Sequence, residues 1–599
     1  MFDKKDNDFA PAKSVSRRGF IRIATMGAGA AAISPALIGC GGSSSAAAGT
    51  TTTTTSTAAT SWSFGIMADT QWTVADDGMN PYTCSAEVIR QINNQFVNNG
   101  VAFVVHVGDL CDGTSEPATQ TDGELIRAAY TQALFNNGIG FFPLRGNHDD
   151  AASLATEFQS NYPQCVNGVQ NNTPSTAMTV TNPDASKQPV VAKTGSNFTV
   201  GSNFSSPDPW STGDLKGLSY SFDYNNTRIV MLDQFTPTDS NAAYGLTTGI
   251  ASQQSWITSR LSSKTAGGHA FVFAHKGLIT ENHTDVLLGS DPSQNPTATD
   301  AFIKSLASNG VHLYCCGHDH MHDRTLVYTS DGKSASVMQV VSQSDSSKFY
   351  IPASPANNVT YNVAAFGHTR QVPIQQELYK IGYYLVTIEG NNATVEYWAA
   401  DISSTDVSGT YLASTIPALN FTLRETYGYS LVGQQFQIAQ GGSFTTVGDT
   451  SPNGTVATIL SGTNLSIAQD ASNRALVRVV NTGWSTVSGL GSDVLHLWGM
   501  QSDIGSEQSE TYTLQISYDY TQNDVAYFSL AAGSVGIATL DDSGKWINAV
   551  SSNFGGTKNF VAGPWKSSYT LGTYGVDTTK GVAWAVVNYG GKFAVASGI

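Results

Sequence analysis

Charged side chains are scarce in this chain of 599 residues, of which only 13% are Asp, Glu, Lys or Arg. Basic residues are the scarcer kind, with 30 Lys and Arg against 46 Asp and Glu, and the formal net charge is −16 at pH 7. Such a charge argues against general binding to nucleic acids or to anionic membranes, since both are negative themselves. The chain is instead rich in Ser, Thr, Asn and Gln, and 58 residues are Gly. This composition is typical of exported, β-rich proteins.

The apolar stretch near the N-terminus, residues 23–38, is too short and too rich in Gly and Ala for a stable membrane span. It follows residues 16–22 (SRRGFIR), which resemble the twin-arginine export signal, and ends in residues 37–40 (LIGC), which resemble a bacterial lipobox. The resemblance implies cleavage before Cys40 and a lipid on its thiol. The chain is then an exported bacterial protein, periplasmic or at the cell surface, with this anchor as its only membrane contact. In the alternative, Cys40 is incidental to a plain cleavage region.

Cysteine is also scarce, with six residues in the chain. Without Cys40 an odd number remains, so the cysteines cannot all pair with one another. Cys315 and Cys316 are neighbours in a predicted strand and point to opposite faces, so a bond between them would be strained. A bond between Cys84 and Cys165 stays open as an alternative, because both lie in loops after predicted strands.

Five short polar clusters stand out against this background, and each directly follows a short apolar run that predicts a buried strand. The clusters are Asp69-Thr70-Gln71, Gly108-Asp109-Leu110-Cys111-Asp112, Gly146-Asn147-His148-Asp149, His275 and Gly317-His318-Asp319-His320. Side chains at the ends of buried strands meet at one edge of a sheet, where loops can hold them against a metal ion. The sequence therefore predicts one site built from distant segments.

This order of motifs, D-x-[HQ], G-D-x-x-D, G-N-H-[DE], a lone His and G-H-x-H, resembles that of the calcineurin-like metallophosphoesterase superfamily. The resemblance covers about residues 62–400 and implies a site for two divalent metal ions. It implies that one ion is held by Asp69, Gln71, Asp109 and His320. It implies that the other is held by Asp109, Asn147, His275 and His318, which makes Asp109 the bridge.

The residue types agree with that chemistry, because two cations roughly 3.5–4 Å apart need a bridging carboxylate, with imidazole and amide oxygen at the other positions. Water held between two cations has a lowered pKa and can attack phosphorus in line, so no nucleophilic side chain is needed. Gln71 stands where many members of the superfamily have His. Its neutral oxygen weakens the preference for zinc, so of manganese, iron and zinc we expect manganese to be favoured.

His148 adjoins the expected ligand Asn147 and is the residue we assign to proton transfer. The matching His of the superfamily protonates the leaving oxygen or binds phosphate. Asp112, three residues after Asp109, is expected to orient the His148 imidazole, as a carboxylate often does.

The remaining histidines carry no comparable signal. His106 lies inside an apolar strand, where a core histidine with satisfied nitrogens is expected rather than a ligand. His322 follows the last motif and is expected either at the substrate or in solvent. No motif surrounds the others, although one of them, His283, lies in the loop after His275 and could line the cleft. The others are His269, His312, His368 and His496.

The length calls for more than one domain. Residues 1–40 form the export signal, residues 41–61 a flexible tether of Gly, Ser, Thr and Ala, and residues 62–404 the phosphoesterase domain. Helical patterns alternate with strands in this domain, at residues 86–98, 123–135 and 252–263. Two hairpins are predicted, at residues 218–233 and 381–399. The fold class is α/β, and the resemblance implies a four-layer αββα sandwich with the metal site at the carboxyl ends of central strands.

An insertion in this domain, residues 151–217, is rich in Asn, Ser, Thr and Pro and predicts a lid beside His148. Its aromatic residues Tyr162 and Trp210 either stack on substrate or only pack within the loop. From residue 410 to 599, short alternating runs predict an all-β domain, sandwich-like and in one or two parts. These runs are residues 475–480, 494–498, 512–518, 524–529 and 581–588.

Three functions remain open at this point. The first is a secreted, membrane-tethered, metal-dependent hydrolase of a small phosphomonoester or phosphodiester. The second is a cell-surface binding or adhesion protein in which the hydrolase domain is secondary or inactive. The third is a protein phosphatase, which suits the expected location poorly because phosphoproteins are scarce outside the cytoplasm. The sequence does not determine the oligomeric state.

Overall fold

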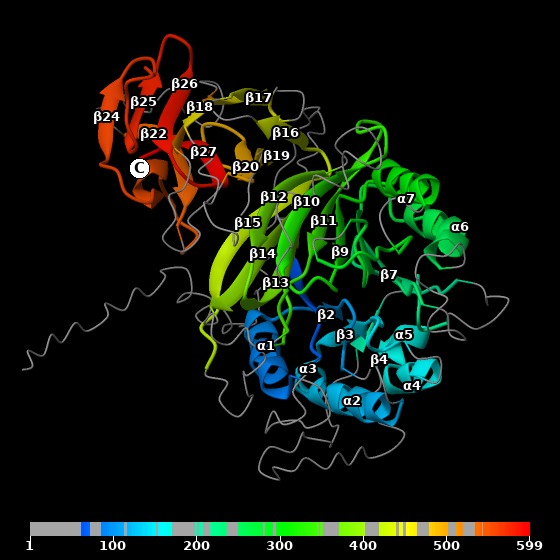
Figure 1. Cartoon of the computed structure of the whole chain (residues 1–599). Helices are drawn as coiled ribbons and strands as arrows, with labels where there is room; N and C mark the ends of the chain where they lie inside the picture. Colours follow the sequence, from blue (N-terminus) through cyan, green and yellow to red (C-terminus); the bar gives the residue numbers. More distant parts are fainter. Residues whose placement is uncertain are drawn as a thin grey trace, which may run out of the picture.

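The structure is a computed structural model of the whole chain (Figure 1). It describes residues 61–71, 85–112, 117–150, 154–170, 198–200, 203–207, 216–235, 249–279, 282–290, 295–346, 348–350, 371–401, 418–438, 442–446, 451–463, 478–500, 511–518, 534–541 and 543–599. Several predictions lie outside these residues. They concern the export signal, the lipobox, the tether, Cys84, Trp210, His368 and the strand at residues 524–529.

The first sheet has six strands in the order β15-β14-β13-β1-β2-β3. The three strands that precede polar clusters form its parallel half. They are β1 (Trp62–Met67), β2 (Phe103–His106) and β3 (Gly140–Pro143). The other half is antiparallel: β13 (Lys380–Glu389), β14 (Asn392–Asp401) and β15 (Thr422–Ser430). β15 follows the expected domain boundary at residue 404, yet it pairs with β14 along nearly its whole length. The first sheet therefore extends to Ser430.

The second sheet has seven strands in the order β12-β10-β11-β9-β8-β7-β6. Its strands are β6 (Tyr220–Tyr224), β7 (Thr227–Leu232), β8 (His269–Ala274), β9 (Leu313–Cys316), β10 (His322–Tyr328), β11 (Ser336–Val341) and β12 (Gln371–Glu377). β7, β8, β9 and β11 run parallel to one another, whereas β6, β10 and β12 are antiparallel to their neighbours.

Helices cover the outer face of each sheet, so four layers result (Figure 1). The helices over the first sheet are α1 (Ala86–Asn99), α2 (Pro117–Tyr130), α3 (Gln132–Asn136), α4 (Leu154–Asn161) and α5 (Gln164–Asn167). Those over the second are α6 (Ile250–Ser262) and α7 (Pro296–Ser308). A short pair of strands, β4 (Val169–Gln170) and β5 (Phe198–Thr199), lies beside α5. The four-layer α/β sandwich expected from the sequence is confirmed.

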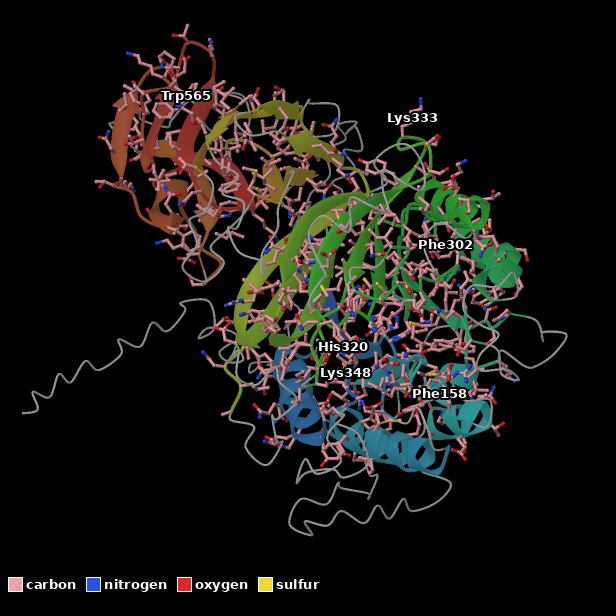
Figure 2. All side chains as sticks on the ribbon, in the orientation of Figure 1. Phe158, Phe302, His320, Lys333, Lys348 and Trp565 are labelled. Carbon is pink, nitrogen blue, oxygen red and sulfur yellow. The ribbon has the colours of Figure 1, made fainter. Side chains whose placement is uncertain are left out.

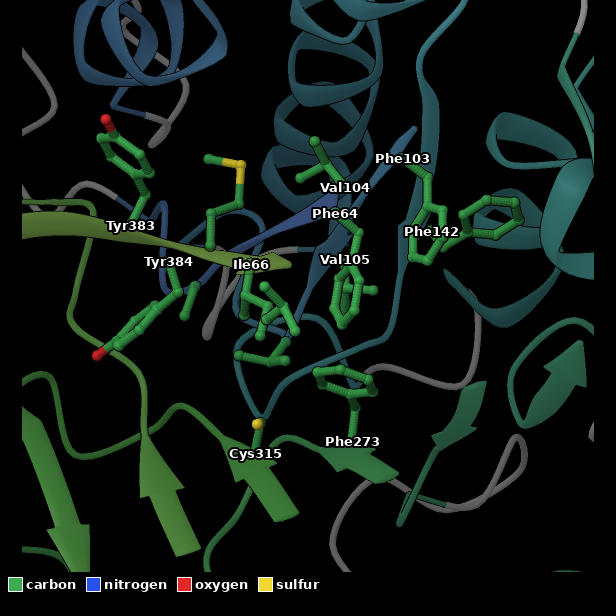
Figure 3. Close-up of a cluster of buried hydrophobic side chains, with 14 of the residues drawn as sticks. Phe64, Ile66, Phe103, Val104, Val105, Phe142, Phe273, Cys315, Tyr383 and Tyr384 are labelled. Carbon is green, nitrogen blue, oxygen red and sulfur yellow. The ribbon is translucent and has the colours of Figure 1, made fainter. Parts of the chain in front are cut away.

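The core between the two sheets forms because successive strand residues point to opposite faces. Phe271 and Phe273 of β8 face the first sheet; Phe271 meets Phe64 with ring centroids 5.2 Å apart. Figure 3 shows Phe273 and Phe64 in this core. Cys315 belongs to this inner core, while its neighbour Cys316 belongs to the core under α6 and α7. The two thiols thus point to opposite faces, as expected, and both are free.

Cys165 is a free, buried thiol. Cys84, its partner in the disulfide that stayed open as an alternative, lies outside the described residues. The prediction for His322 is wrong. His322 reaches neither substrate nor solvent. It is fully buried between the sheets, with Nδ1 2.8 Å from the Tyr384 hydroxyl and Nε2 3.0 Å from Glu425 Oε2. The carboxylate partner lies on β15, a strand that the sequence did not assign to this domain.

Tyr162 and His106 have structural roles. Tyr162 is fully buried and packs against Phe141 and Phe158, with ring centroids 5.9 Å and 4.9 Å away, so loop packing is the correct alternative for it. His106 is buried in β2, where its Nε2 lies 3.0 Å from Thr70 Oγ1 and its Nδ1 accepts from the Gly108 amide. It is therefore a core histidine, as expected.

The C-terminal part consists of two further six-stranded sheets, ordered β16-β19-β20-β27-β22-β23 and β17-β18-β21-β26-β25-β24. Apolar residues of both sheets share one core, which confirms the predicted all-β region. The strands of the first are β16 (Gln434–Ile438), β19 (Arg478–Ser485), β20 (Val494–Trp498), β22 (Val535–Leu540), β23 (Trp546–Asn548) and β27 (Gly591–Ser597). Those of the second are β17 (Phe444–Thr446), β18 (Ala457–Thr463), β21 (Thr511–Ser517), β24 (Asn559–Ala562), β25 (Thr573–Asp577) and β26 (Val582–Val587).

This β region contacts the first sheet of the α/β sandwich. The indole of Trp498 donates to Thr394 Oγ1 at 3.1 Å, and Lys592 pairs with Glu389 at 2.6 Å. Across the part of the chain that the structure describes, no helix has the length and apolar character needed to cross a membrane.

Two histidines join the sheets at the end remote from the polar clusters. His269 lies between the Tyr429 hydroxyl, 3.1 Å from its Nδ1, and the Gly390 carbonyl, 2.9 Å from its Nε2. His312 stacks on the ring of Tyr429 with centroids 4.0 Å apart. Burial lowers the pKa of His312 to about 4, and the nearby His269 and Lys264 act in the same direction.

We therefore expect His312 to make the protein less stable in acid. The pKa of an unfolded histidine is about 6.5, so below that pH the unfolded chain binds the proton more readily than the folded one. This contribution to stability is complete above pH 7 and is lost as the pH falls through 6 and 5 toward 4; at pH 5 the loss is on the order of 2 kcal/mol. Urea unfolding of the wild type and of His312→Gln at pH 7 and pH 5 measures it. The variant should lose less stability between the two pH values, and equal losses would contradict this role.

Candidate metal centre

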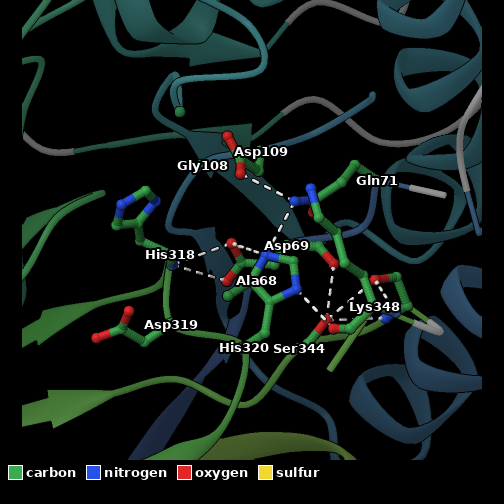
Figure 4. Close-up of polar contacts among 12 residues, drawn as sticks. Ala68, Asp69, Gln71, Gly108, Asp109, His318, Asp319, His320, Ser344 and Lys348 are labelled. Carbon is green, nitrogen blue, oxygen red and sulfur yellow. Dashed lines mark hydrogen bonds and ion pairs between the residues drawn. The ribbon is translucent and has the colours of Figure 1, made fainter. Parts of the chain in front are cut away.

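The five polar clusters meet at one edge of the sandwich, because the strands that precede them end there. β1, β2 and β3 are parallel neighbours in the first sheet, and β8 and β9 are parallel neighbours in the second. Their carboxyl ends face each other across the interface between the sheets, so loops from both sheets contribute side chains (Figure 4). All seven predicted ligands lie at this edge. They are Asp69, Gln71, Asp109, Asn147, His275, His318 and His320.

Two groups of possible ligands share one carboxylate. Atoms of Asp109, His275 and His318 lie within 4.8 Å of one another, as do atoms of Asp69, Asp109 and His320. All five side chains are buried. Asp109 belongs to both groups, which is the arrangement that a bridging carboxylate between two cations requires.

The His275 group has too few protons for the acceptors that it brings together. His275 Nδ1 lies 2.9 Å from the Val107 carbonyl and donates its proton there. In a neutral imidazole the other nitrogen then holds a lone pair. That nitrogen, Nε2, lies 2.9 Å from Asn147 Oδ1 and 3.3 Å from Asp109 Oδ1, and neither oxygen has a hydrogen to give. A cation among these three atoms satisfies all of them.

In the His320 group one buried acceptor, the Gln71 amide oxygen, receives no proton from the residues that the structure describes. His320 Nδ1 donates to the Lys348 carbonyl at 2.6 Å, so in the neutral ring Nε2 is left with its lone pair, 3.4 Å from Asp69 Oδ1. The Gln71 amide nitrogen lies 2.9 Å from Asp109 Oδ2 and 3.0 Å from His320 Nε2, while the buried Gln71 Oε1 has no hydrogen-bond partner among the described residues. A 180° flip of the amide exchanges its nitrogen and oxygen and places Oε1 beside Asp109 Oδ2 and His320 Nε2. The residues therefore fit a second cation.

The ionisation of these side chains points the same way. Burial raises the pKa of the Asp69 carboxyl well above its usual range, and the neighbouring Asp109 carboxylate raises it further. Burial acts upward on Asp109 too, but His275 and His148 hold the Asp109 pKa well below its usual range. Burial lowers the pKa of His318 to about 3, so its imidazole is neutral at pH 7. Two adjacent carboxyls and neutral imidazoles form a set of ligands that a cation stabilises.

The backbone around the site is strained in a way that aims these side chains inward. Asp69, Asp109, His318 and His320 all have positive φ, between 50° and 74°, which residues other than glycine adopt rarely. Close packing needs a glycine as well. A Cβ at Gly146 would lie 2.0 Å from Asp109 Oδ1, so no larger residue fits beside this carboxylate.

Asp149, the last residue of the third cluster, holds the loops together. Its carboxylate accepts from the backbone amides of Leu110, Cys111 and Gly146 at 2.8, 3.1 and 3.1 Å. Atoms of Asp149, Cys111 and Glu124 also lie within 4.8 Å of one another. Because the Asp149 oxygens already accept these amides, we assign this group to loop support rather than to metal binding.

His148, the residue expected to transfer a proton, is in contact with Asp112, the residue expected to orient it. His148 Nδ1 lies 2.6 Å from Asp112 Oδ1, and Nε2 lies 3.9 Å from Asp109 Oδ2. Burial acts to lower the pKa of His148, but the charge of Asp109 and the hydrogen bond with Asp112 raise it above its ordinary value. The ring is thus oriented by Asp112 and presents Nε2 to the site.

The structure adds residues that the motifs did not indicate. Asp285 Oδ1 lies 3.3 Å from His318 Nε2, and its other oxygen pairs with Lys276. His283, which had no motif around it but could line the cleft, stacks on His318 with centroids 3.9 Å apart and pairs with Asp319 at 2.8 Å. The loop around residues 282–290 has no pattern that reveals these contacts.

Lys348 is the other addition, and a signal for it was present. β11 runs parallel to β9, so the segment after it reaches the same edge as the last motif. That segment begins with the polar run of residues 342–346 directly after an apolar strand, which is the pattern that marked the other clusters. Lys348 Nζ lies 3.0 Å from His148 Nε2.

Comparison with known proteins finds a family match in the first part of the chain. Residues 63–322 match the family model described as calcineurin-like phosphoesterase. No curated protein sequence matches the chain. Similar solved structures include that of PhoD, with 11% identity over 62% of this chain and 70% of that chain and a TM-score of 0.35. A dimetal phosphatase from Danio rerio has 14% identity over 56% of this chain and 95% of its own, with a TM-score of 0.32.

Purple acid phosphatase PPD1 from seeds of yellow lupin (Lupinus luteus) has 14% identity over 62% of this chain and 54% of its own, with a TM-score of 0.32. With TM-scores this low, the similarity to the phosphoesterase family is supported by the matched segment and by the ligand groups. Asp69, Asp109 and His320 all fall within that segment. Residues 63–322 are therefore similar to calcineurin-like phosphoesterases and contain candidate metal-ligand clusters.

Proposed function

We propose that this chain is a metal-dependent hydrolase of small phosphoesters and that it acts outside the cytoplasm. The observation that carries the proposal is the meeting of His275 Nε2, Asn147 Oδ1 and Asp109 Oδ1, three acceptors without a proton to share. A matching group forms around His320 on the other side of Asp109. The family match supports phosphoester hydrolysis as the reaction.

In this proposal Asp69, Gln71, Asp109 and His320 hold one divalent cation, and Asp109, Asn147, His275 and His318 hold the other. When bound, the cations supply an activated water and stabilise negative charge on the phosphoryl oxygens. Manganese is favoured over zinc because Gln71 offers a hard, neutral oxygen at the position where many members of the superfamily have the softer imidazole of His.

The protein's own side chains perform the remaining tasks. Asp285 fixes the His318 ring through Nε2, and the Val107 carbonyl fixes His275 through Nδ1, so both ligands are oriented before substrate arrives. In the structure His148 Nε2 accepts from the Lys348 ammonium; once that nitrogen is protonated, the ring, oriented by Asp112, gives the proton to the oxygen of the leaving alcohol. Once neutral, the same nitrogen can take a proton back from solvent.

The location is a proposal from the sequence. Residues 16–22 and 37–40 match an export signal and a lipobox, and the low charge content suits an exported protein. The tether of residues 41–61 then separates the catalytic domain from the membrane surface.

Asp109→Asn should abolish hydrolysis, because the shared ligand loses its charge. With the manganese-loaded protein, we expect the kcat for p-nitrophenyl phosphate to fall by at least about 10³-fold. The reason is that both cations would lose the carboxylate that they share. Bound metal, measured by elemental analysis, should fall with it. Glu157→Gln on α4 is the control and should keep both. A wild type that binds metal yet hydrolyses no phosphoester of a broad panel would favour the surface-binding function instead.

His148→Asn should act through the leaving group. A general acid contributes about 10²–10⁴-fold when the leaving alcohol is a poor leaving group. The variant should therefore lose far more kcat/KM toward an alkyl phosphate than toward p-nitrophenyl phosphate, whose leaving group needs little help. Asp112→Asn should show the same trend more weakly. Equal losses on both substrates would contradict proton donation by His148.

Cys40→Ser should release the protein from the membrane. Fractionation of the native host, with metabolic labelling by palmitate, should find the wild type labelled and in the membrane fraction. The variant should be unlabelled and soluble outside the cytoplasm. Retention of label by the variant, or a cytoplasmic wild type, would rule out the lipoprotein proposal.

A further inference from the structure

Lys348 places its ammonium group beside the proton-transfer residue of the metal centre. Its Nζ lies 3.0 Å from His148 Nε2, and that nitrogen is 3.9 Å from Asp109 Oδ2. One nitrogen atom of His148 therefore lies between the lysine and the shared ligand Asp109. Figure 2 shows Lys348 next to His320 at the edge where the sheets end.

The backbone of this lysine is fixed to the metal centre itself. Its carbonyl accepts from His320 Nδ1 at 2.6 Å, and its amide donates to Ser346 Oγ at 3.2 Å (Figure 4). Ser346 Oγ lies 3.0 Å from Ser344 Oγ, which donates to the Asp69 carbonyl at 3.4 Å. The position of Lys348 thus depends on the same residues that would hold one of the cations.

Among the described residues no carboxylate is in direct contact with the Lys348 ammonium, although its charge acts on the Asp69 carboxyl and opposes the rise in the pKa of Asp69 that burial causes. Two fully buried cations near the site have such a partner: Lys276 pairs with Asp285, and Arg145 pairs with Asp233 at 2.7 Å. The partners recorded for the Lys348 ammonium are a histidine nitrogen and the ring of Tyr350, whose centroid is 5.9 Å away. A cation held in place without an anion is suited to bind an anionic group of a substrate.

We propose that Lys348 is a ligand of the substrate's phosphoryl group and gives the enzyme a preference for phosphomonoesters over phosphodiesters. The proposal rests on the proposed function, since it concerns the same site. A monoester carries a second negative charge and a third terminal oxygen, whereas a diester has an ester oxygen at that position. An ammonium interacts as a point charge, so it gains most from the extra charge of the monoester.

The test uses manganese-loaded full-length protein and the variants Lys348→Met, Lys348→Gln and Lys348→Arg. Lys333→Met is the matched control, because Lys333 is exposed on the β10–β11 turn far from the site (Figure 2). Orthophosphate affinity is measured by calorimetry, and kcat/KM is measured for p-nitrophenyl phosphate and bis-p-nitrophenyl phosphate. If Lys348→Met does not fold or does not bind its metals, Lys348→Gln replaces it in the test.

Removal of the charge should weaken orthophosphate binding by at least about 10-fold and lower kcat/KM for the monoester by about 100-fold, with a change of less than about 5-fold for the diester. Lys348→Arg should stay within about 10-fold of the wild type, since it keeps the charge. Unchanged orthophosphate affinity, or equal losses on both esters, would overturn the proposal. A wild type that binds orthophosphate but hydrolyses neither ester would refute the proposed function alone, and the orthophosphate affinities would still decide the role of Lys348.

Discussion

The structure depends on a surplus of hydrogen-bond acceptors around one buried carboxylate. Asp109 is 1% exposed and lies among the side chains of Asp69, Asn147 and His275, all aimed at the same small volume. Burial of so many lone pairs and charges without protons is costly in a low-dielectric interior. Cations bound among these acceptors would turn this cost into stabilisation, and the residues present fit them.

The fold brings these acceptors together by packing two sheets face to face with their parallel strands ending at one edge. An apolar core, with Phe64 of one sheet against Phe271 of the other, fixes the distance between the loops of the two sheets. Positive φ angles at Asp69 and His320 then turn the side chains inward. Asp149 adds rigidity, because it ties together the amides of the two loops that flank Asp109. The strain and the buried charge are concentrated where the chemistry takes place.

Much of this could be predicted from the sequence. Apolar runs directly followed by short polar clusters indicated both the strands and the residues at their ends, because a parallel strand leaves its next residue at the functional edge. Three kinds of feature escaped this reasoning. Asp285 and His283 come from a loop without periodicity, and their contacts depend on tertiary packing alone. Glu425 pairs with His322 across the sheets from a strand far along the chain. Lys348 follows β11, a strand that carries no family motif.

The central claim is that two cations share the Asp109 carboxylate, and anomalous diffraction from a crystal grown with manganese tests it most directly. Two peaks about 3.5–4 Å apart on either side of that carboxylate are predicted, one near His275 and one near His320. A single peak, no peak, or a peak confined to the Cys111, Glu124 and Asp149 group would contradict it.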